Sequence, residues 1–339
     1  MHVSVIGAGS FGTVLASVAA ANQHRVSLWC HTAEQARTIN TQGCNPRYHP
    51  ELTLGAGILA THDLAACVAE ADLVILSVPS KAMAAVCRQV APYLPAGVGL
   101  ISTTKGIQAD GFLLMSEVIE AACPGYPVGV LSGPNLAAEI AQRHLTASVI
   151  ASPDGSLRDL ARAALSNKYL RLYSATDRIS VELGGSLKNI YAIASGLAAA
   201  LQVGSNTQAA LITRALAEMS RLASYLGGNP MTFLGLAGVG DLMVTCTSPL
   251  SRNYRVGWLL GQGKTLVEAE AEIGQVAEGI NTLELVHAKA QALDVVMPIV
   301  EGLHEVIFGQ RPARQVAVKL MQAAHTSDVE FVLPRKPGP

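Results

Sequence analysis

The chain has 339 residues, of which half are hydrophobic but only 4% aromatic, so its apolar interior consists mainly of Ala, Val, Leu and Ile. Its 24 basic and 25 acidic residues give a net charge of −1. This balance excludes a chain-wide positive field of the kind that recruits nucleic acid or an anionic membrane. The length is sufficient for two domains of ordinary size, each with a buried core.

The distribution of cysteine and histidine indicates reduced thiols and no metal. The cysteines form no CxxC pair, and the histidines form no HExxH pattern. Scattered thiols of this kind are typical of a cytoplasmic protein. No charged leader with a cleavage site precedes Val3, so we expect no signal peptide. The most apolar segment, Ile190–Leu201, is too short for an integral membrane segment.

From residue 1 to about 176, short apolar runs alternate with amphipathic stretches. We expect strands at Val3–Ile6, Val26–Trp29, Ile58–Ala60, Leu73–Val78, Leu100–Ser102, Val128–Leu131, Ser148–Ala151 and Leu170–Tyr173. Helices are expected between them, for example at Phe11–Ala21, Leu64–Ala71, Ala82–Ala91 and Phe112–Ala122. Alternation of this kind predicts βαβ units and a mainly parallel sheet. Because most runs are apolar throughout, we expect the sheet to be covered on both faces.

The pattern changes near Asp177, after which we find helical periodicity and no convincing strand. Helices are expected at about 178–202, 207–226, 231–235, 253–260, 265–273, 281–291, 298–308 and 312–323. The first is rich in small residues, so neighbouring backbones should approach it closely. We therefore predict an α/β Rossmann-type domain over 1–176 and an all-α domain over 177–330. The Pro-rich tail, 331–339, should be disordered.

The first chemical motif is the Gly-rich stretch GAGSFG at Gly7–Gly12. It follows an expected strand and opens an expected helix. Gly7 permits a tight turn, Gly9 lets the backbone approach a pyrophosphate, and Gly12 lets the helix pack on the strand. The helix N-terminus then offers N–H groups to phosphate oxygens. The alternative is a Gly-rich turn of an unrelated α/β protein, and the strand and helix on either side favour dinucleotide binding.

The end of the second expected strand bears on the choice of cofactor. An acidic residue there binds the ribose 2′-hydroxyl of NAD, whereas a basic residue suits NADP. Here the strand ends in Trp29, Cys30, His31 and Thr32, with no carboxylate. His31 is either a partner for the 2′-phosphate or an ordinary loop histidine. We expect use of both NADP(H) and NAD(H), with a modest NADPH preference that grows as the pH falls.

Two later loops lie where strands of the expected sheet end, which is the edge at which open α/β sheets bind ligands. Lys105 lies in the stretch STTKG and is either a ligand or a solvated loop lysine. Asn135 lies in SGPN, before Ala137, and capping of the following helix is a sufficient explanation for it.

The second domain contains further polar groups within apolar sequence. Lys188, next to Leu187, either extends to solvent or is held in a site, where partial burial would lower a lysine pKa toward neutrality. Asp241 and Ser251 can each be read as a helix cap. Ser251, Arg252 and Asn253 together have the chemistry for binding a phosphate.

Taken together, these stretches resemble the bacterial NAD(P)-dependent glycerol-3-phosphate dehydrogenases from Val3 to about Leu320. The matching stretches are GAGSFGT, NPRYHP, LVILSVPS, STTKGI, LSGPN, VELGGSLKNIYAIASG, LAGVGDLMVTCTS, SRN and VAEGI, in the family's order. The resemblance implies a Rossmann-type domain with a C-terminal domain like that of 6-phosphogluconate dehydrogenase. It also implies a cytoplasmic homodimer that supplies glycerol 3-phosphate for phospholipid synthesis.

The resemblance also implies roles for individual residues. Contacts to the cofactor would be made by Ser10, Phe11, His31, Lys105, Ala137, Arg252, Val276 and Glu278, besides the glycines Gly7, Gly9 and Gly12. The triose phosphate would be surrounded by Lys105, Gly133, Asn135, Lys188, Asp241, Ser251, Arg252 and Asn253. Lys188 would transfer the proton, assisted by Lys105 and oriented by Asp241, in a cleft between the domains.

The sequence departs from the family pattern at three positions. Asn135 stands where Ser or Thr is usual, and Leu136 where Phe is common. Thr32 occupies a position that is often basic in the family, which argues against a strong NADP preference. A hydroxyacid dehydrogenase of the same two-domain build, or a non-catalytic NAD(P)-sensing protein, is the alternative interpretation. Neither accounts for the GVGDL, TCTS and SRN series together with both lysines.

Overall fold

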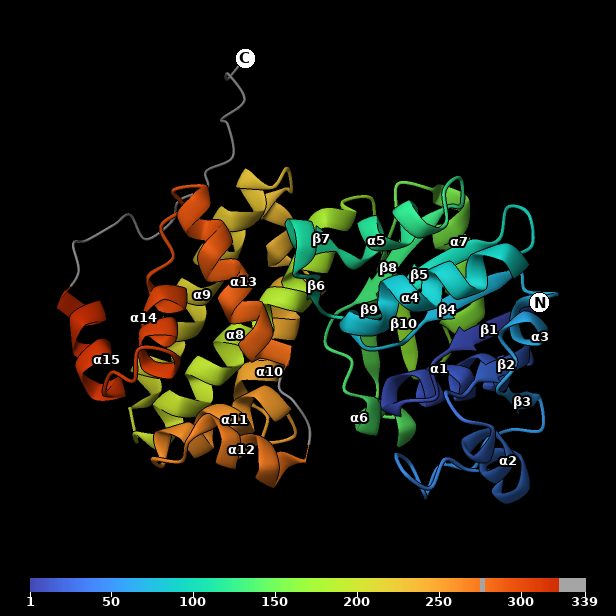
Figure 1. Ribbon diagram of the computed structural model, residues 1–339, viewed down its shortest axis with the longest axis horizontal. Helices are drawn as coiled ribbons and strands as arrows, with labels where there is room; N and C mark the ends of the chain where they lie inside the picture. The colour runs from blue at the N-terminus through green and yellow to red at the C-terminus, as the bar shows by residue number, and fades with distance from the viewer. Residues whose placement is uncertain (275–277, 323–339) are drawn as a thin grey trace, which may run out of the picture. The chain divides into compact units, whose positions relative to one another are not determined.

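The computed structural model describes residues 1–274 and 278–322. The chain divides into two compact units, of which the first is Met1–Glu182 and the second begins at Leu183 (Figure 1). The division therefore falls inside one helix, α8 (Arg178–Ala200), whereas the sequence placed the boundary at 176/177. The predicted tail over 331–339 and the predicted cofactor contact Val276 lie outside the described residues.

The N-terminal unit is built on an eight-stranded sheet of order β10-β9-β8-β5-β4-β1-β2-β3. Neighbouring strands are parallel except β8 and β9, which run antiparallel. The prediction of a mainly parallel Rossmann-type sheet is thus confirmed. The strands are β1 (His2–Ile6), β2 (Arg25–Trp29), β3 (Ile58–Thr61), β4 (Leu73–Leu76), β5 (Gly99–Ser102), β8 (Val128–Ser132), β9 (Thr146–Ala151) and β10 (Leu170–Ala175).

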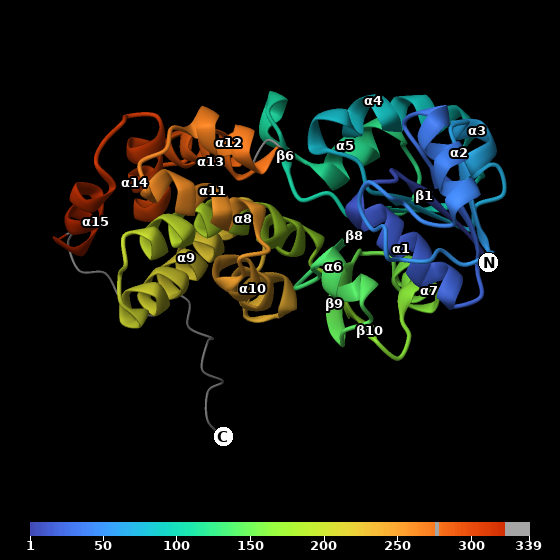
Figure 2. The ribbon, with the colours of Figure 1, turned by 90° about the horizontal axis from the view of Figure 1, so that it is seen from below.

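Helices cover both faces of this sheet, as the apolar strands predict. Figure 2 shows α3, α4 and α5 on one face and α1, α6 and α7 on the other. Two separate clusters of buried apolar side chains correspond to the two faces. The helices are α1 (Ser10–Ala21), α2 (Ala33–Gln42), α3 (Leu64–Val68), α4 (Ser80–Val90), α5 (Met115–Ala122), α6 (Ala137–Ala141) and α7 (Gly155–Leu165).

One small feature of this unit was not predicted from the sequence. β6 (Ile107–Gln108) pairs antiparallel with β7 (Leu113–Leu114), and α5 therefore begins at Met115 rather than at Phe112. Two-residue strands are too short to show the alternation by which a strand is recognised.

The described residues of the C-terminal unit form helices and no strand, which confirms the predicted all-α domain. It contains α9 (Ser205–Tyr225), α10 (Asp241–Thr247), α11 (Arg252–Gly261), α12 (Leu266–Ile273), α13 (Glu278–Ala292), α14 (Pro298–Ile307) and α15 (Ala313–Gln322), besides most of α8. Helix α10 was not predicted from the sequence, because seven residues that follow a Gly-rich stretch show little periodicity.

Small residues let the backbones of α8 and α11 touch. A Cβ atom on Gly196 of α8 would overlap the carbonyl oxygen of Tyr254, and one on Gly257 of α11 would overlap that of Ile193. The expectation that neighbouring backbones approach this helix closely is confirmed.

Two buried glutamates bond the starts of distant helices. Glu218 of α9 accepts the N–H groups of Ile299 (2.6 Å) and Val300 (3.3 Å) at the N-terminus of α14. Glu182 accepts from the backbone N–H (2.9 Å) and hydroxyl (2.6 Å) of Ser116 at the start of α5. Burial raises the pKa of each carboxyl to about 7. In both cases a carboxylate from another helix accepts backbone N–H groups that a local N-cap side chain would otherwise bind.

All six cysteines are free thiols, in agreement with their spacing. Among the described residues, no helix combines the length and hydropathy that a membrane span requires.

We predict that the stability effect of Glu218→Gln depends on pH. Burial raises the Glu218 pKa from 4.5 to about 7. The Glu218 carboxyl therefore makes its full contribution to stability below pH 4.5, and this contribution is lost as the pH rises through about 7. The glutamine at position 218 does not ionise. The unfolding free energy of the variant minus that of wild type should therefore increase by roughly 1–3 kcal/mol between about pH 5 and about pH 8.

Urea unfolding at the two pH values measures this difference. Glu182 titrates in both proteins, so its contribution cancels. A difference in unfolding free energy that stays constant with pH would contradict the prediction.

Candidate functional site

The Gly-rich turn joins β1 to α1, and at two of its positions there is no space for a side chain. Gly7 has φ +116°, and a Cβ atom on it would overlap the carbonyl oxygen of Ser77. A Cβ on Gly12 would overlap the carbonyl oxygen of Gly7. The position of a Cβ on Gly9 is open, with no atom within 4 Å. The turn therefore leaves its backbone accessible beside the N-terminus of α1.

A cavity of about 750 Å³ adjoins this turn in the N-terminal unit. It lies at the carboxyl ends of β1, β2 and β4, and its lining includes Gly7, Ala8, Gly9, Trp29, His31, Thr32, Ser77, Val78 and Pro79. A hollow of this volume at the carboxyl edge of a parallel sheet, beside a helix N-terminus, suits a dinucleotide cofactor. His31 is one of the residues that line this cavity.

Two residues of this cavity, Arg47 and Tyr48, were not predicted from the sequence. The Arg47 guanidinium lies over the Tyr48 ring, with its central carbon 5.5 Å from the ring centroid. Arg47 is the one Lys or Arg in the described lining. Both belong to the NPRYHP stretch, one of those that resemble the family.

Lys105 ties two loops of the carboxyl edge together. Its Nζ donates to the carbonyl oxygen of Gly133 (3.2 Å) and to Oδ1 of Asn135 (2.9 Å). Asn135 does not cap α6, which corrects the sequence interpretation: the residue before Ala137 is Leu136, and no side chain bonds the helix start. The Asn135 carboxamide is instead turned toward Lys105. Its buried Nδ2 has no partner among the described residues, which leaves a donor for a ligand.

Lys188 is held in a site and does not extend to solvent. It lies in the middle of α8 and is 5% exposed. Its Nζ donates to Oδ1 of Asp241, the first residue of α10, and to Oγ1 of Thr245 (2.8 Å). Asp241 is itself 1% exposed. A charge buried this deeply is tolerated only with such a partner.

Thr245 contacts Lys188 beside Asp241 and was not predicted from the sequence. Its hydroxyl donates to the Asp241 carbonyl oxygen (2.6 Å) and accepts from Lys188. It follows Asp241 by one helical turn, so the two side chains lie on one face of α10. Thr245 belongs to the TCTS motif. Its four-residue spacing from Asp241 indicates a shared helix face only once α10 is known to be a helix.

The Ser-Arg-Asn cluster forms the start of α11. The Ser251 hydroxyl caps the helix by accepting from the N–H of Tyr254 (3.3 Å), and Arg252 is exposed. Oδ1 of Asn253 accepts from the N–H of Gly279, which follows Glu278 at the start of α13 (3.2 Å).

Gly279 also brings α13 against α8. A Cβ on Gly279 would lie 2.8 Å from the carbonyl oxygen of Asn189, the neighbour of Lys188. The C-terminal unit thus gathers Lys188, the Ser-Arg-Asn cluster and Glu278 around adjacent helices. In the N-terminal unit, Phe11 and Ala137 are partly buried against one apolar cluster.

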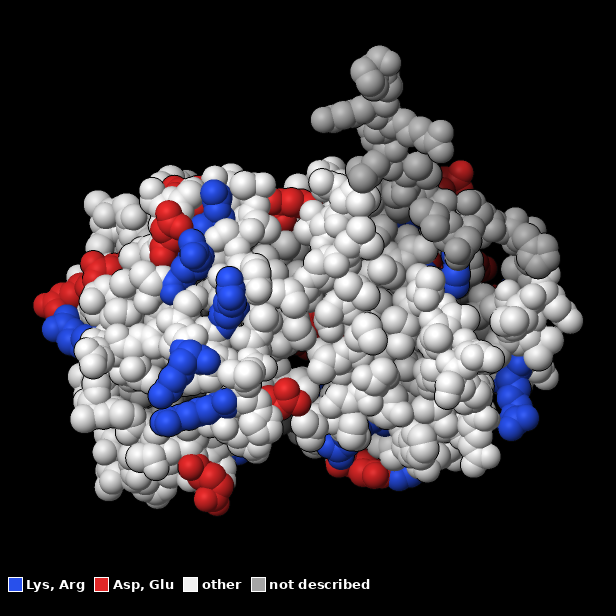
Figure 3. All heavy atoms as spheres, turned by 180° about the vertical axis from the view of Figure 1, so that it is seen from behind, with Lys and Arg blue, Asp and Glu red and all other residues white. Residues whose placement is uncertain are grey.

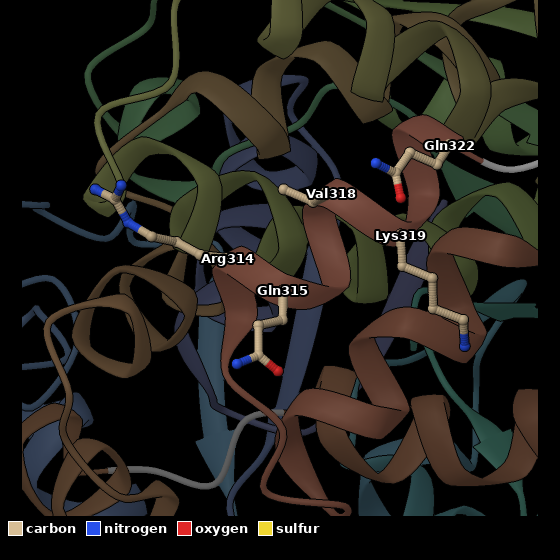
Figure 4. Close-up of a pocket in the computed structure, with 5 residues that line it drawn as sticks. All are labelled: Arg314, Gln315, Val318, Lys319 and Gln322. Carbon is tan, nitrogen blue, oxygen red and sulfur yellow. The ribbon is translucent and has the colours of Figure 1, made fainter.

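A second hollow, of about 630 Å³, is lined by Arg314, Gln315, Val318, Lys319 and Gln322 (Figure 4). All five side chains come from α15, and none belongs to the predicted site. Volume alone therefore does not locate the chemistry.

Comparison with known proteins identifies the family. Residues 2–158 match the N-terminal domain described as that of NAD-dependent glycerol-3-phosphate dehydrogenase, and residues 177–318 match the C-terminal domain. The chain belongs to this family. The resemblance stated from the sequence motifs is confirmed.

Individual glycerol-3-phosphate dehydrogenases are similar along nearly the whole chain. The glycerol-3-phosphate dehydrogenase [NAD(P)+] of Azotobacter vinelandii is 53% identical over 330 residues, 97% of each chain. That of Teredinibacter turnerae is 51% identical over 331 residues, 98% of this chain and 97% of its own. The crystal structure of the Coxiella burnetii enzyme is 37% identical and covers 95% of this chain and 99% of its own, with a TM-score of 0.90.

More distant structures share only the fold. A ketopantoate reductase from Ralstonia eutropha is 16% identical with a TM-score of 0.61, covering 95% of this chain and 100% of its own. The two-domain build is therefore common to enzymes with different substrates, and the substrate must be inferred from the site residues.

Proposed function

We propose that this protein interconverts dihydroxyacetone phosphate and sn-glycerol 3-phosphate with NADP(H) or NAD(H), and supplies glycerol 3-phosphate for phospholipid synthesis. The observation that carries the proposal is the buried Lys188, held by Asp241 and Thr245. A lysine fixed in this way in a dinucleotide-binding dehydrogenase has the chemistry to move a proton to or from a substrate oxygen.

The N-terminal unit has the residues to hold the cofactor. The backbone of Gly7–Gly9 and the first turn of α1 would hold its pyrophosphate, and the cavity lined by His31 and Arg47 would hold its adenosine end. When bound, the cofactor would supply the hydride for reduction of the triose, or accept one from the alcohol.

Lys188 completes the reaction at oxygen. As the carbonyl oxygen gains negative charge, the Lys188 ammonium transfers a proton to it, and in the reverse direction the amine accepts the hydroxyl proton. A positioned general acid contributes roughly 10²–10⁴ in rate. Asp241 and Thr245 fix the direction of Nζ, which keeps the proton aligned with the reacting oxygen.

Lys105 and Asn135 provide further polar contacts to the triose. The Lys105 ammonium, which donates to Asn135 Oδ1, has the charge to stabilise a developing oxyanion. The unpartnered Nδ2 of Asn135 is available to a substrate oxygen. Arg252 and the polar start of α11 bind the phosphate, so that binding energy from the non-reacting end positions the carbonyl.

We further infer that the protein works in the cytoplasm as a homodimer. Figure 3 shows Lys and Arg side chains gathered on one face of the N-terminal unit, whereas the C-terminal unit in that view is largely uncharged. An uncharged face suits contact with a second copy. Light scattering in solution tests the dimer.

The first prediction tests the reaction and the proton donor together. Purified protein should consume NADPH when dihydroxyacetone phosphate is added. Lys188→Met should lower turnover by at least about a hundredfold, because the general acid is lost, while NADPH binding stays nearly unchanged. Loss of NADPH absorbance measures turnover, and fluorescence titration measures binding.

The matched control is Lys168→Met, which removes an exposed lysine of the N-terminal unit. It should leave turnover at the wild-type level. Wild-type turnover in Lys188→Met would refute the proton-transfer role, and reduction of a hydroxyacid's keto form in place of the triose would refute the substrate.

The next prediction concerns the phosphate. A charge-assisted hydrogen bond contributes roughly 1.5–3 kcal/mol, so Arg252→Ala should reduce kcat/KM for dihydroxyacetone phosphate at least about tenfold. Phosphate-free dihydroxyacetone should lose much less. Arg255→Ala, an exposed arginine on the same helix, is the control. Equal losses with both ketones would assign Arg252 to the fold or the cofactor.

A further prediction concerns cofactor choice. No carboxylate follows β2 at Cys30, His31 or Thr32 to repel a 2′-phosphate. Arg47 adds a permanent positive charge to the same cavity, whose lining also includes Glu34 of α2. Arg47→Gln and His31→Ala should each lower kcat/KM for NADPH more than for NADH. Arg37→Gln, an exposed change on α2, is the control. Equal losses with both cofactors would place these side chains away from the 2′-phosphate.

A further inference from the structure

A segment between α2 and β3 crosses the Gly-rich turn and is bonded to it at both ends. At one end, Asn45 Nδ2 donates to the carbonyl oxygen of Ala8 (3.0 Å) and to the hydroxyl of Thr13 (2.8 Å). At the other, Nε2 of His49 lies 2.9 Å from the Ser10 hydroxyl oxygen and 3.1 Å from the Ser10 carbonyl oxygen. The segment, Asn45–His49, is thus held rigidly over the start of α1.

The Ser10 carbonyl determines which ring nitrogen of His49 carries the proton. A carbonyl oxygen only accepts, so Nε2 must be the N–H donor. Burial lowers the His49 pKa, which favours the neutral ring with a single N–H group. The same N–H also points at the Ser10 hydroxyl oxygen. That oxygen accepts from His49, and its own proton is directed elsewhere.

Ser10 stands where a phosphate donor is needed. It is the first residue of α1, and the preceding Gly9 provides no side-chain cap for the helix. The backbone N–H groups of the first turn and the Ser10 side chain therefore both lie at the N-terminus of α1. In the described part of the chain, the Ser10 hydroxyl has no partner besides His49.

We propose that His49 is a positioning residue that orients the Ser10 hydroxyl as a hydrogen-bond donor to the pyrophosphate of the nicotinamide cofactor. The inference rests on the proposed use of NAD(P)(H). It goes further by assigning a role to the NPRYHP stretch. Because both cofactors carry the pyrophosphate, His49 supports the binding of both and does not select between them.

The test is a double-mutant cycle between His49 and Ser10, read out by equilibrium binding to the full chain. His49→Phe keeps the ring volume but removes the N–H donor. It should weaken NADPH and NADH binding by about tenfold, as expected for a hydrogen bond to a charged group. Adenosine, which lacks phosphate, should lose less than about twofold.

Two further variants separate orientation of the hydroxyl from support of the fold. In a Ser10→Ala background, His49→Phe should weaken cofactor binding by a further factor of less than about two, because the hydroxyl that His49 orients is already absent. His49→Gln should restore most of the affinity, because its amide N–H reaches the position of Nε2. Since the effect is on the bound ground state, KM for the cofactor should rise while kcat at saturation stays within about twofold.

His24→Phe is the control, since it makes the same exchange beyond the C-terminal end of α1, where the ring contacts the carbonyl oxygen of Ala163. An equal loss from His49→Phe in both backgrounds, an equal loss for adenosine, or failure of His49→Gln to restore binding would overturn the proposal. These binding measurements need no turnover. A wild type that binds NADPH but does not reduce dihydroxyacetone phosphate would refute the proposed reaction and leave the role of His49 standing.

Discussion

The buried ammonium group of Lys188 is the constraint on which the C-terminal unit depends. A charge removed from water is tolerated only when an opposite charge and hydrogen-bond acceptors surround it. Asp241 and Thr245 supply these groups from successive turns of α10. The short helix α10 must therefore lie directly against α8. The close approach of α11 to α8, made possible by Gly196 and Gly257, then places the Ser-Arg-Asn cluster on a neighbouring helix.

In the N-terminal unit, the main constraint is that polar backbone groups must stay exposed to a ligand beside a well-packed sheet. Gly7 and Gly12 make the turn so tight that helix and strand touch, and Gly9 leaves its surface open. The Asn45–His49 segment then holds this turn from outside by hydrogen bonds at both ends. A cofactor site formed in this way is rigid before the ligand arrives, which lowers the entropy that binding would otherwise lose.

The same physical rule governs the helix starts elsewhere in the molecule. Glu182 and Glu218 bring carboxylates from distant helices to the N-termini of α5 and α14. Each bond satisfies backbone N–H groups and also fixes one helix against another. Both carboxyls have a raised pKa because they are buried without a neighbouring cation as their main partner. The two carboxyl groups fix the orientation of the packed helices, and they lower the stability of the fold at higher pH.

The sequence by itself determined the class of fold, the eight strands of the main sheet, most helices and the family. Apolar periodicity is a local property, and motifs such as GAGSFG and GGSLKN need only their immediate neighbours to be recognised. It could not decide between the two interpretations of Lys188, and it assigned Asn135 to a helix cap. Only the tertiary structure paired Lys188 with Asp241, turned Asn135 toward Lys105 and placed Arg47 and His49 around the cofactor turn. These partners are far apart in the chain, and which of them meet depends on how whole helices and loops pack.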